Sequence, residues 1–480
     1  MATYAQQLAD FVSATRFEQL PAEVVEYTKL VILDSLICGI AAGPMERSRM
    51  MQAVVGQLGG PPEASLFGSN LRVPAVHAAM ANAEMMNLLD ADDTLFTSAH
   101  FAVFNVAAGL AEAQRRGRSG KDLIRSVAVG FDINARLNLA MLLMDEVDGA
   151  FQWSSLAGMG FASFGTAASA AVVSGLDREQ TRNLFGLVSW LAPTAVALGT
   201  GTRREFDSMK CQNNAGAAHA GMLAARLAEH GYVGDQDCLD RDPGFMRAQG
   251  SLRTDHELLV ADLGQKWWIL ETAIKYYPSC RFTHGPIDML RRLMQEQQLQ
   301  PSEIERIEIY MNPMAYAISM FRDPPQRIAP DHRAPLNGQF NIPYVMALAA
   351  LNRRPGPRWY APETLADPEV WGLASRIHTT VDPAAKDEVL RAFRDTRIRR
   401  FRKTPGALAV WARGQQYRCT TEYCDGDPWT PETRASWERV THKFHDFCDD
   451  LLPQQRIDQV VKQVRYLEDI GDLSAEFTAL

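Results

Sequence analysis

The residues best suited to chemistry are three carboxylates, Asp90, Asp92 and Asp93, which lie within four positions of one another, with His100 shortly after them. Carboxylates this close repel, so solvent, a cation, a proton or nearby lysine and arginine side chains must offset the repulsion. Such a cluster is typical of acid–base or anion-binding sites. A solvated acidic loop with a capping histidine is the alternative interpretation.

The neighbours of this cluster predict how it is positioned. A helix is expected over about 75–90, and if it persists Asp90, Asp93 and Thr94 share one of its faces. Thr97 or Ser98 is the expected N-cap of a second helix over about 100–117. His100 would then lie in a first turn, where the helix dipole favours a neutral imidazole that can act as a base.

A second group of reactive side chains lies in the loop 275–286, ahead of a helix expected over 284–296. Hydroxyl, ammonium and guanidinium groups beside free backbone N–H groups form a cradle suited to a carboxylate; the candidates are Lys275, Ser279, Cys280, Arg281 and His284. A capped turn with surface cations is the alternative. Cys280 could be a nucleophile, but the spacing identifies no partner base, and a buried inert thiol is the other interpretation.

Three further features carry weaker signals. Lys210 precedes a helix rich in small residues and could bind an anion or lie in solvent, and the glycines before it match no dinucleotide or P-loop fingerprint. His442 and His445 lie three residues apart without an evident third ligand, so we interpret them as part of a surface helix. Tyr316 has no motif of its own and reads as a core tyrosine.

The elements that must position these residues are mainly helical up to about residue 261. The apolar stretches there are long, rich in Ala, Leu and Met, and separated by Gly or Pro; further helices are expected over about 21–43, 120–143, 155–174 and 213–230. Several are apolar nearly all round, which predicts a multilayer helical domain. Beyond residue 267, alternating runs at 304–311, 377–381 and 407–423, mixed with helical runs, predict an α+β domain.

The expected organisation is therefore a helical domain over 1–265, an α+β domain over 266–428, and a helical segment over 429–480 that returns to the first domain. The fold class is mainly α with a smaller α+β lid. The Pro- and Arg-rich stretch 353–368 is expected to be a surface connection.

Composition narrows the partners. The 480 residues are 46% hydrophobic and 22% charged, with 49 Lys and Arg against 57 Asp and Glu, a net charge of −8 and no basic run, which disfavours nucleic acid. No apolar stretch reaches the roughly 20 residues that a bilayer requires, and no signal peptide is recognisable, so no membrane association and a cytoplasmic location are expected. Seven cysteines without a C-x-x-C pair predict reduced thiols.

In order and type, these clusters resemble the MmgE/PrpD family, whose members include 2-methylcitrate dehydratase, cis-aconitate decarboxylase and iminodisuccinate epimerase. The resemblance rests on Leu33–Leu36 with Gly39, on Leu89–Thr94 with His100, on Lys210 before an Ala-rich helix, and on Lys275–His284. Weaker similarity runs through 337–344, 425–428 and 441–444, so nearly the whole chain is covered.

The resemblance implies a homodimer, an active site between a helical and an α+β domain, and no metal or organic cofactor. The family's active-site positions fall on Asp90, Thr94, His100, Lys210 and Lys275, with Tyr316 a looser match; Ser279, Cys280, Arg281 and His284 lie in the matching motif. The chain departs from the family at Asn87 and Asn213, where histidines are usual, and near Ser155, where a third histidine is missing. The two asparagines can still hydrogen-bond substrate without titrating.

The resemblance implies a lyase acting on a small polycarboxylate, and our leading hypothesis is dehydration of a hydroxylated di- or tricarboxylate. In this interpretation Lys210, Lys275 and Arg281 bind carboxylate oxygens, and His100 transfers a proton with Asp90 beside it. Epimerisation (an isomerase) and decarboxylation by the same site are alternatives, as is a non-catalytic metabolite-binding relative. A comparison of Asp92-Asp93 with Mg²⁺-dependent isoprenoid synthases is weak, because Phe96 stands where another carboxylate is needed.

Overall fold

The computed structural model describes residues 2–96, 99–148, 150–154, 158–194, 208–318, 325–400, 402–478 and 480. The first half of the chain is helical, as the apolar patterning predicts, and the last residues form two more helices. The helices of this part are α1 (Tyr4–Ala14), α2 (Ala22–Ala42), α3 (Glu46–Leu58), α4 (Ala75–Asn87), α5 (Ala102–Arg116), α6 (Gly120–Ala140), α7 (Ser163–Ser174), α8 (Arg178–Leu191), α9 (Met209–Glu229), α10 (Phe245–Ala248), α11 (Glu257–Val260), α19 (Trp437–Cys448) and α20 (Gln454–Arg465).

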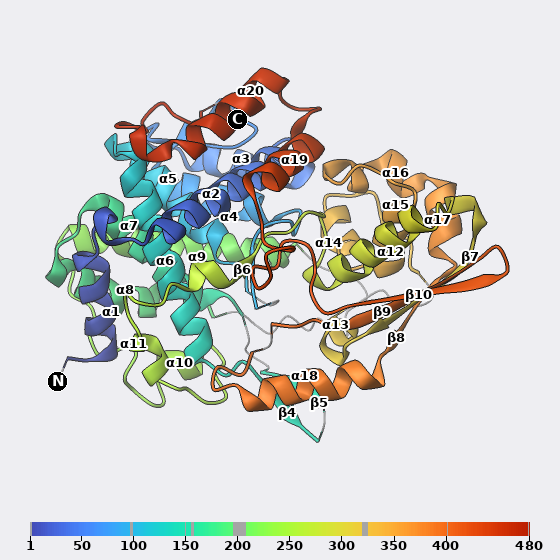
Figure 1. Ribbon diagram of the computed structural model, residues 1–480. Helices are drawn as coiled ribbons and strands as arrows, with labels where there is room; N and C mark the ends of the chain where they lie inside the picture. Colours follow the sequence, from blue (N-terminus) through green and yellow to red (C-terminus); the bar gives the residue numbers. More distant parts are fainter. Residues whose placement is uncertain are drawn as a thin grey trace.

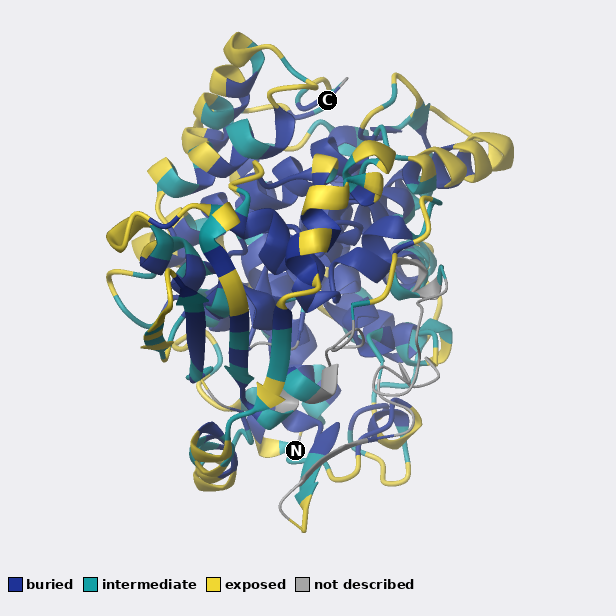
Figure 2. Cartoon of the chain, turned by 90° about the vertical axis from the view of Figure 1, so that its right-hand side faces the viewer, coloured by how far each residue is buried: buried dark blue, intermediate teal, exposed yellow. Residues whose placement is uncertain are grey.

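Several of these helices are buried on all sides. Every residue of α2 from Tyr27 to Ala42 is buried, and the described side chains of α7 are nearly all buried too. Helix α4 packs against α2, α5 and α9, while α7 packs against α5, α6 and α9. Figure 2 shows this buried centre surrounded by elements with exposed outer faces. The expected multilayer helical arrangement is confirmed.

The C-terminal helices lie against the first long helix. Helix α19 packs along α2, and α20 contacts both α2 and α19 (Figure 1). This contact brings residues more than 400 positions apart into one core, and it matters for the site below. The division of the chain at residues 265 and 428 remains a prediction.

The α+β part is built on a four-stranded sheet in the order β10-β9-β7-β8. Its strands are β7 (Ile304–Met311), β8 (Ile377–Val381), β9 (Gly406–Ala412) and β10 (Gln415–Thr421); β7 pairs with β8 in parallel and with β9 antiparallel. The expected hairpin is confirmed, since β9 and β10 pair around Arg413 and Gly414, both with positive φ. The helices of this part are α12 (His284–Glu296), α13 (Pro313–Ile318), α14 (Ala334–Gly338), α15 (Ile342–Ala350), α16 (Pro362–Ala366), α17 (Pro368–Ala374) and α18 (Pro383–Asp395).

Three two-stranded ribbons lie outside the four-stranded sheet. These are β1 (Ala64–Ser65) with β2 (Arg72–Val73), β3 (Thr94–Leu95) with β6 (Thr272–Ala273), and β4 (Met144–Val147) with β5 (Ala150–Trp153). The β3–β6 ribbon is the important one for function, because Thr94 pairs with Ala273 and thereby places the acidic segment beside Lys275.

The structure corrects the expected helix boundaries around the acidic segment. Helix α4 ends at Asn87, and Asp90 adopts a left-handed conformation with φ 51°, so Asp90, Asp93 and Thr94 do not share a helical face. Helix α5 begins only at Ala102, which leaves His100 ahead of the helix instead of in its first turn. The proposed caps Thr97 and Ser98 lie outside the described residues.

Other segments also differ from the expected boundaries or exposure. Helix α6 ends at Ala140 and α7 begins at Ser163, so both are shorter than the apolar runs suggested. The stretch 353–368 is not simply a surface connection, because Trp359 and Tyr360 within it are buried. Among the described side chains, the free thiols expected from the cysteine spacing are Cys38, Cys238, Cys280, Cys419, Cys424 and Cys448. No helix in the described part of the chain combines the length and apolar character needed to cross a bilayer.

Candidate active site

Three groups from separate parts of the chain meet at one oxygen atom, Oδ1 of Asp90. The Nζ atom of Lys275 lies 2.9 Å from it, Nζ of Lys210 lies 3.5 Å from it, and Nε2 of His100 lies 3.6 Å from it. Asp90 and Lys275 are buried, whereas His100 is partly exposed. The predicted convergence of the three sequence clusters is thus present, with the carboxylate of Asp90 at its centre.

The backbone explains why Asp90 reaches this position. After α4 ends, the N–H of Asp90 donates to the carbonyl of Asn87 at 3.0 Å, and its left-handed conformation turns the chain toward β3. Aspartate tolerates this conformation better than most residues with a side chain. Lys275 lies two residues after the end of β6, so the β3–β6 ribbon fixes the lysine opposite the turn.

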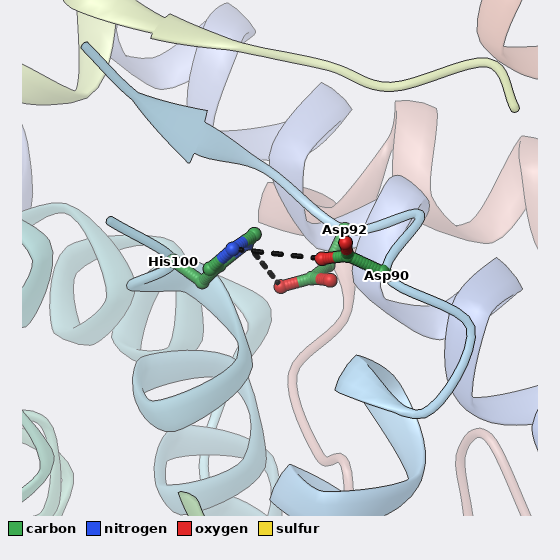
Figure 3. A group of neighbouring side chains, drawn as sticks. All are labelled: Asp90, Asp92 and His100. Atoms are coloured by element: carbon green, nitrogen blue, oxygen red, sulfur yellow. Dashed lines mark ion pairs between the residues drawn. The ribbon is translucent and has the colours of Figure 1, made fainter. Parts of the chain in front are cut away.

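The ring of His100 is oriented by the same loop. Its Nδ1 lies 2.8 Å from the carbonyl oxygen of Asp93 and 3.2 Å from Oδ2 of Asp92. Because a carbonyl can only accept, we assign the proton to Nδ1, which leaves Nε2 to gain or release a proton on the side facing Asp90. Figure 3 shows the contacts from the imidazole of His100 to the carboxylates of Asp90 and Asp92.

The two carboxylates are kept ionised by their neighbours. Burial alone would raise the pKa of Asp90, but Lys210, Lys275 and His100 hold it below its usual value. Burial also raises the pKa of Asp92, but the charges of His100 and Lys275 lower it by more, so this pKa too lies below its usual value. Asn87 donates from Nδ2 to both Asp92 oxygens, at 3.0 and 3.1 Å. The Asn87 amide therefore orients Asp92.

Asp93 has a different role from its neighbours. Its Oδ1 accepts from the backbone N–H of Ala102 at 2.9 Å, and its Oδ2 accepts from the Thr272 hydroxyl at 2.8 Å. Asp93 therefore supplies the cap of α5 that was expected from Thr97 or Ser98. Burial and the charge of Asp92 raise the pKa of Asp93 to about 7.

Lys210 lies in the first turn of α9, not ahead of that helix as expected, and it is also contacted from the α+β side. Its Nζ lies 3.4 Å from Oε1 of Gln339 and 5.5 Å from the centre of the Phe340 ring. The cation–π contact and the amide oxygen both favour the charged ammonium. The site is therefore shared between the helical part, which supplies Asp90, His100 and Lys210, and the segment just before α15.

Only part of the loop 275–286 contacts the site: Lys275 contacts Asp90, whereas Arg281 contacts Asp427 in the protein interior. The guanidinium of Arg281 pairs with the carboxylate of Asp427 and donates to the carbonyl of Asp425 at 3.0 Å. The His284 ring lies 3.2 Å from the carbonyl of Ser279, and burial followed by the charges of Arg281 and Lys275 puts its pKa well below the usual value. Both side chains thus have partners within the protein, and their role in substrate binding stays a prediction.

Ser279 and Cys280 of the same loop have hydrogen-bond partners within the protein. The Ser279 hydroxyl is buried and shares a 2.6 Å hydrogen bond with the hydroxyl of Thr283. Burial raises the pKa of the Cys280 thiol to about 12, which keeps it a thiol and argues against a nucleophile. The backbone N–H of Cys280 donates to the carbonyl of Gln339 at 2.9 Å, tying this loop to the segment beside Lys210.

Three candidate residues remain: Thr94, Tyr316 and Asn213. Thr94 is buried in β3, and its hydroxyl has no hydrogen-bond partner among the described residues. Tyr316 lies in α13 and packs partly buried against the core, and its role stays a prediction. Asn213 belongs to α9, but its side chain lies outside the described ones.

A buried ion pair beneath the acidic turn was missed by sequence reasoning. Lys443 of α19 pairs with Asp34 of α2 and donates to the carbonyl of Ala91 at 2.6 Å. Ala91 lies between Asp90 and Asp92, so the pair supports the turn from below. Both residues lie in stretches noted in the sequence analysis for their family resemblance, 33–36 and 441–444, and that resemblance could have drawn attention to them. Gln339 was missed as well, although it lies in the stretch 337–344 noted above.

The cluster also has the composition of a metal site. One ligand atom each from Asp90, Asp92 and His100 lie within 4.8 Å of one another. However, Lys275 already donates a hydrogen bond to the Asp90 carboxylate, and Asn87 donates one to the Asp92 carboxylate. With Asp93 used as a helix cap, the geometry favours neutralisation by ammonium groups over an aspartate-rich Mg²⁺ motif.

Residues 6–254 match the MmgE/PrpD N-terminal domain, and residues 277–466 match the MmgE/PrpD C-terminal domain. The chain belongs to the MmgE/PrpD family. It is 26% identical to a cis-aconitate decarboxylase-like protein of Aspergillus oryzae, over 98% of this chain and 95% of the relative. It is 23% identical to a cis-aconitate decarboxylase of Aspergillus terreus over 98% and 94% of the two chains, and 25% identical to human cis-aconitate decarboxylase over 65% of each.

Proposed function

We propose that this protein is a lyase that decarboxylates a small unsaturated polycarboxylate related to cis-aconitate. The observation that carries the proposal is the meeting of Lys210, Lys275 and His100 at Asp90. Two ammonium groups attract a substrate carboxylate, and an imidazole beside them can deliver a proton to carbon. The names of the relatives at 22–26% identity support the same class of reaction.

The chemistry requires one proton for each turnover. Loss of CO₂ leaves the electron pair of the broken carbon–carbon bond on the substrate, where a neighbouring unsaturated carboxylate can delocalise it. His100 in its imidazolium form, with Nδ1 still protonated, then gives the Nε2 proton to that carbon to form the new carbon–hydrogen bond, and solvent returns a proton to Nε2. The ammonium groups of Lys210 and Lys275 stabilise the negative charge that develops on the carboxylate oxygens.

Decarboxylation suits the titratable groups of this site. Among the described residues, His100 is the one imidazole in contact with Asp90, and Asn87 cannot titrate. Dehydration is the second candidate, and the ionised state of Asp90 favours it, because a base and an acid 3.6 Å apart could serve β-elimination of water. That reaction needs both groups in opposite roles, whereas decarboxylation needs a single proton donor.

Incubation with cis-aconitate, citrate, 2-methylcitrate and aspartate-like acids in D₂O, followed by NMR and CO₂ measurement, tests the proposal. A decarboxylase releases CO₂ and places one solvent deuterium on the product for each turnover. Loss of water without CO₂ would instead establish dehydration, and exchange at an α-carbon without net loss would establish epimerisation. Binding without any turnover would favour a non-catalytic relative.

A matched pair of lysine variants tests the site itself. Lys275→Met removes the ammonium nearest Asp90, and we expect kcat to fall on the order of 10²–10³-fold, as for removal of one electrostatic stabiliser in other active sites. Lys29→Met removes an equally buried lysine that pairs with Glu26 and Glu468, away from the site, and serves as the control. Equal activity in the two variants would refute the assignment.

A further inference from the structure

One buried side chain beside Lys210 has a hydrogen-bonding group that the folded protein does not use. The Gln339 side chain is completely buried, and its Nε2 has no hydrogen-bond partner among the described residues. Burying an amide donor without a partner costs free energy, so such groups are rare and call for an explanation. A ligand that accepts a hydrogen bond in this place would supply one.

The orientation of the amide follows from its neighbour. Oε1 of Gln339 lies 3.4 Å from Nζ of Lys210, and an ammonium group can only donate. The oxygen must therefore face the lysine, and the two N–H donors of Nε2 point elsewhere. Lys210 in turn lies 3.5 Å from the Asp90 carboxylate, so the unused donors belong to the same site.

The backbone around Gln339 is fixed in place, which makes the position of these donors definite. Its carbonyl accepts from the N–H of Cys280 at 2.9 Å, and its own N–H donates to the carbonyl of Pro335 at 3.1 Å. The neighbouring Gly338 lies against the Tyr360 ring, whose hydroxyl donates to the carbonyl of Pro278. The segment is thus clamped to the loop that carries Lys275.

The charge of the surroundings indicates what the donors bind. Lys210 supplies a positive charge next to Gln339, and Lys275 supplies a second one at the Asp90 carboxylate that Lys210 also contacts. An acceptor drawn into this place is therefore an anion, and a carboxylate oxygen matches the paired N–H groups of an amide. The buried Thr94 hydroxyl, also without a partner among the described residues, is a second polar group left for a ligand.

We propose that Gln339 donates a hydrogen bond from Nε2 to a carboxylate of the bound substrate and so selects acids that carry at least two carboxylates. One carboxylate binds at the lysine pair, and a second binds at Gln339. This inference rests on the proposed function, because it assumes that the site binds a polycarboxylate. It adds a substrate-binding residue that the sequence motifs did not assign.

Titration calorimetry with tricarballylate, a saturated tricarboxylate, tests the inference directly. Gln339→Leu keeps the side-chain bulk but removes the donors, and we expect roughly tenfold weaker binding, the ordinary effect of losing one hydrogen bond to a charged group. Gln339→Glu is isosteric and places a carboxylate against the ligand, so binding should weaken further. Gln52→Leu is the matched control, because Gln52 is a buried glutamine that bonds Gly43 and Phe67 away from the site.

Steady-state kinetics supplies a readout that a purely structural role would not change. A contact made equally in the ground and transition states raises KM in proportion to the lost affinity and leaves kcat within a few-fold. Unchanged affinity in both Gln339 variants, or a fall in kcat at constant KM, would overturn the role of Gln339 alone. Failure of the unmodified protein to bind tricarballylate would overturn the proposed function together with it.

Discussion

Replacing Lys443 with methionine tests whether the buried ion pair supports the Asp90 turn. The Lys443 and Asp34 side chains are at most 1% exposed, and the ammonium also serves the carbonyl of Ala91. Methionine keeps an apolar stem of similar length but leaves the Asp34 carboxylate buried without a cation. Breaking such a pair costs roughly 3–5 kcal/mol of the free energy of unfolding.

The pH dependence of this loss can be worked out from Asp34. Burial already raises its pKa to about 6, even though Lys443 opposes the shift. Without the lysine the folded-state pKa must rise further, so folded Lys443→Met retains a proton that the unfolded chain releases above about pH 4. A carboxyl with a raised folded-state pKa contributes stability below the unfolded pKa and loses it as the pH rises through the folded pKa. The cost of the variant is therefore largest near pH 8 and shrinks toward pH 5.

Urea unfolding followed by tryptophan fluorescence, at pH 8 and at pH 5, measures both quantities. The double variant Asp34→Leu with Lys443→Met should recover most of the stability, because an apolar pair replaces the charges. It should not recover turnover, since the Ala91 carbonyl still lacks its donor and the turn at Asp90 is no longer held. A loss below about 1 kcal/mol at pH 8, typical of an exposed pair, or an equal loss at the two pH values, would refute this reasoning.

Three further outcomes are expected. Because burial and Asp92 raise the pKa of Asp93 to about 7, the unmodified protein should lose stability between pH 5 and pH 8 relative to Asp93→Asn, and parallel melting profiles would contradict this. Arg281→Met should lower the melting temperature through loss of the Asp427 pair but leave tricarballylate affinity within about twofold; a selective loss of affinity would restore the sequence-based role of Arg281. Dialysis against EDTA should leave turnover unchanged, because lysines neutralise Asp90, whereas rescue by added Mg²⁺ or Zn²⁺ would show a required ion.

The residue types and their spacing were sufficient for the fold class and for singling out the segments that meet at Asp90. Long apolar stretches with Gly and Pro boundaries predicted the helical layers, and strict alternation predicted β8, because both patterns reflect local periodicity. The clusters around Asp90 and Lys275 were identified from polar and charged groups concentrated in short segments, whereas the role expected for Lys210 came from the family resemblance. The decarboxylation alternative is better supported than the dehydration hypothesis, because the similar proteins are named as cis-aconitate decarboxylases or decarboxylase-like.

The partners of the charged side chains were decided only by tertiary structure. Asp90, Asp92 and Asp93 are chemically equivalent in the sequence, yet one meets two lysines, one is oriented by Asn87, and one caps α5. Arg281 pairs with Asp427, 146 residues away, a contact that no local pattern indicated. Local periodicity determines which face of a helix is buried, whereas the energy of a buried charge depends on groups that distant segments bring within a few ångströms of it.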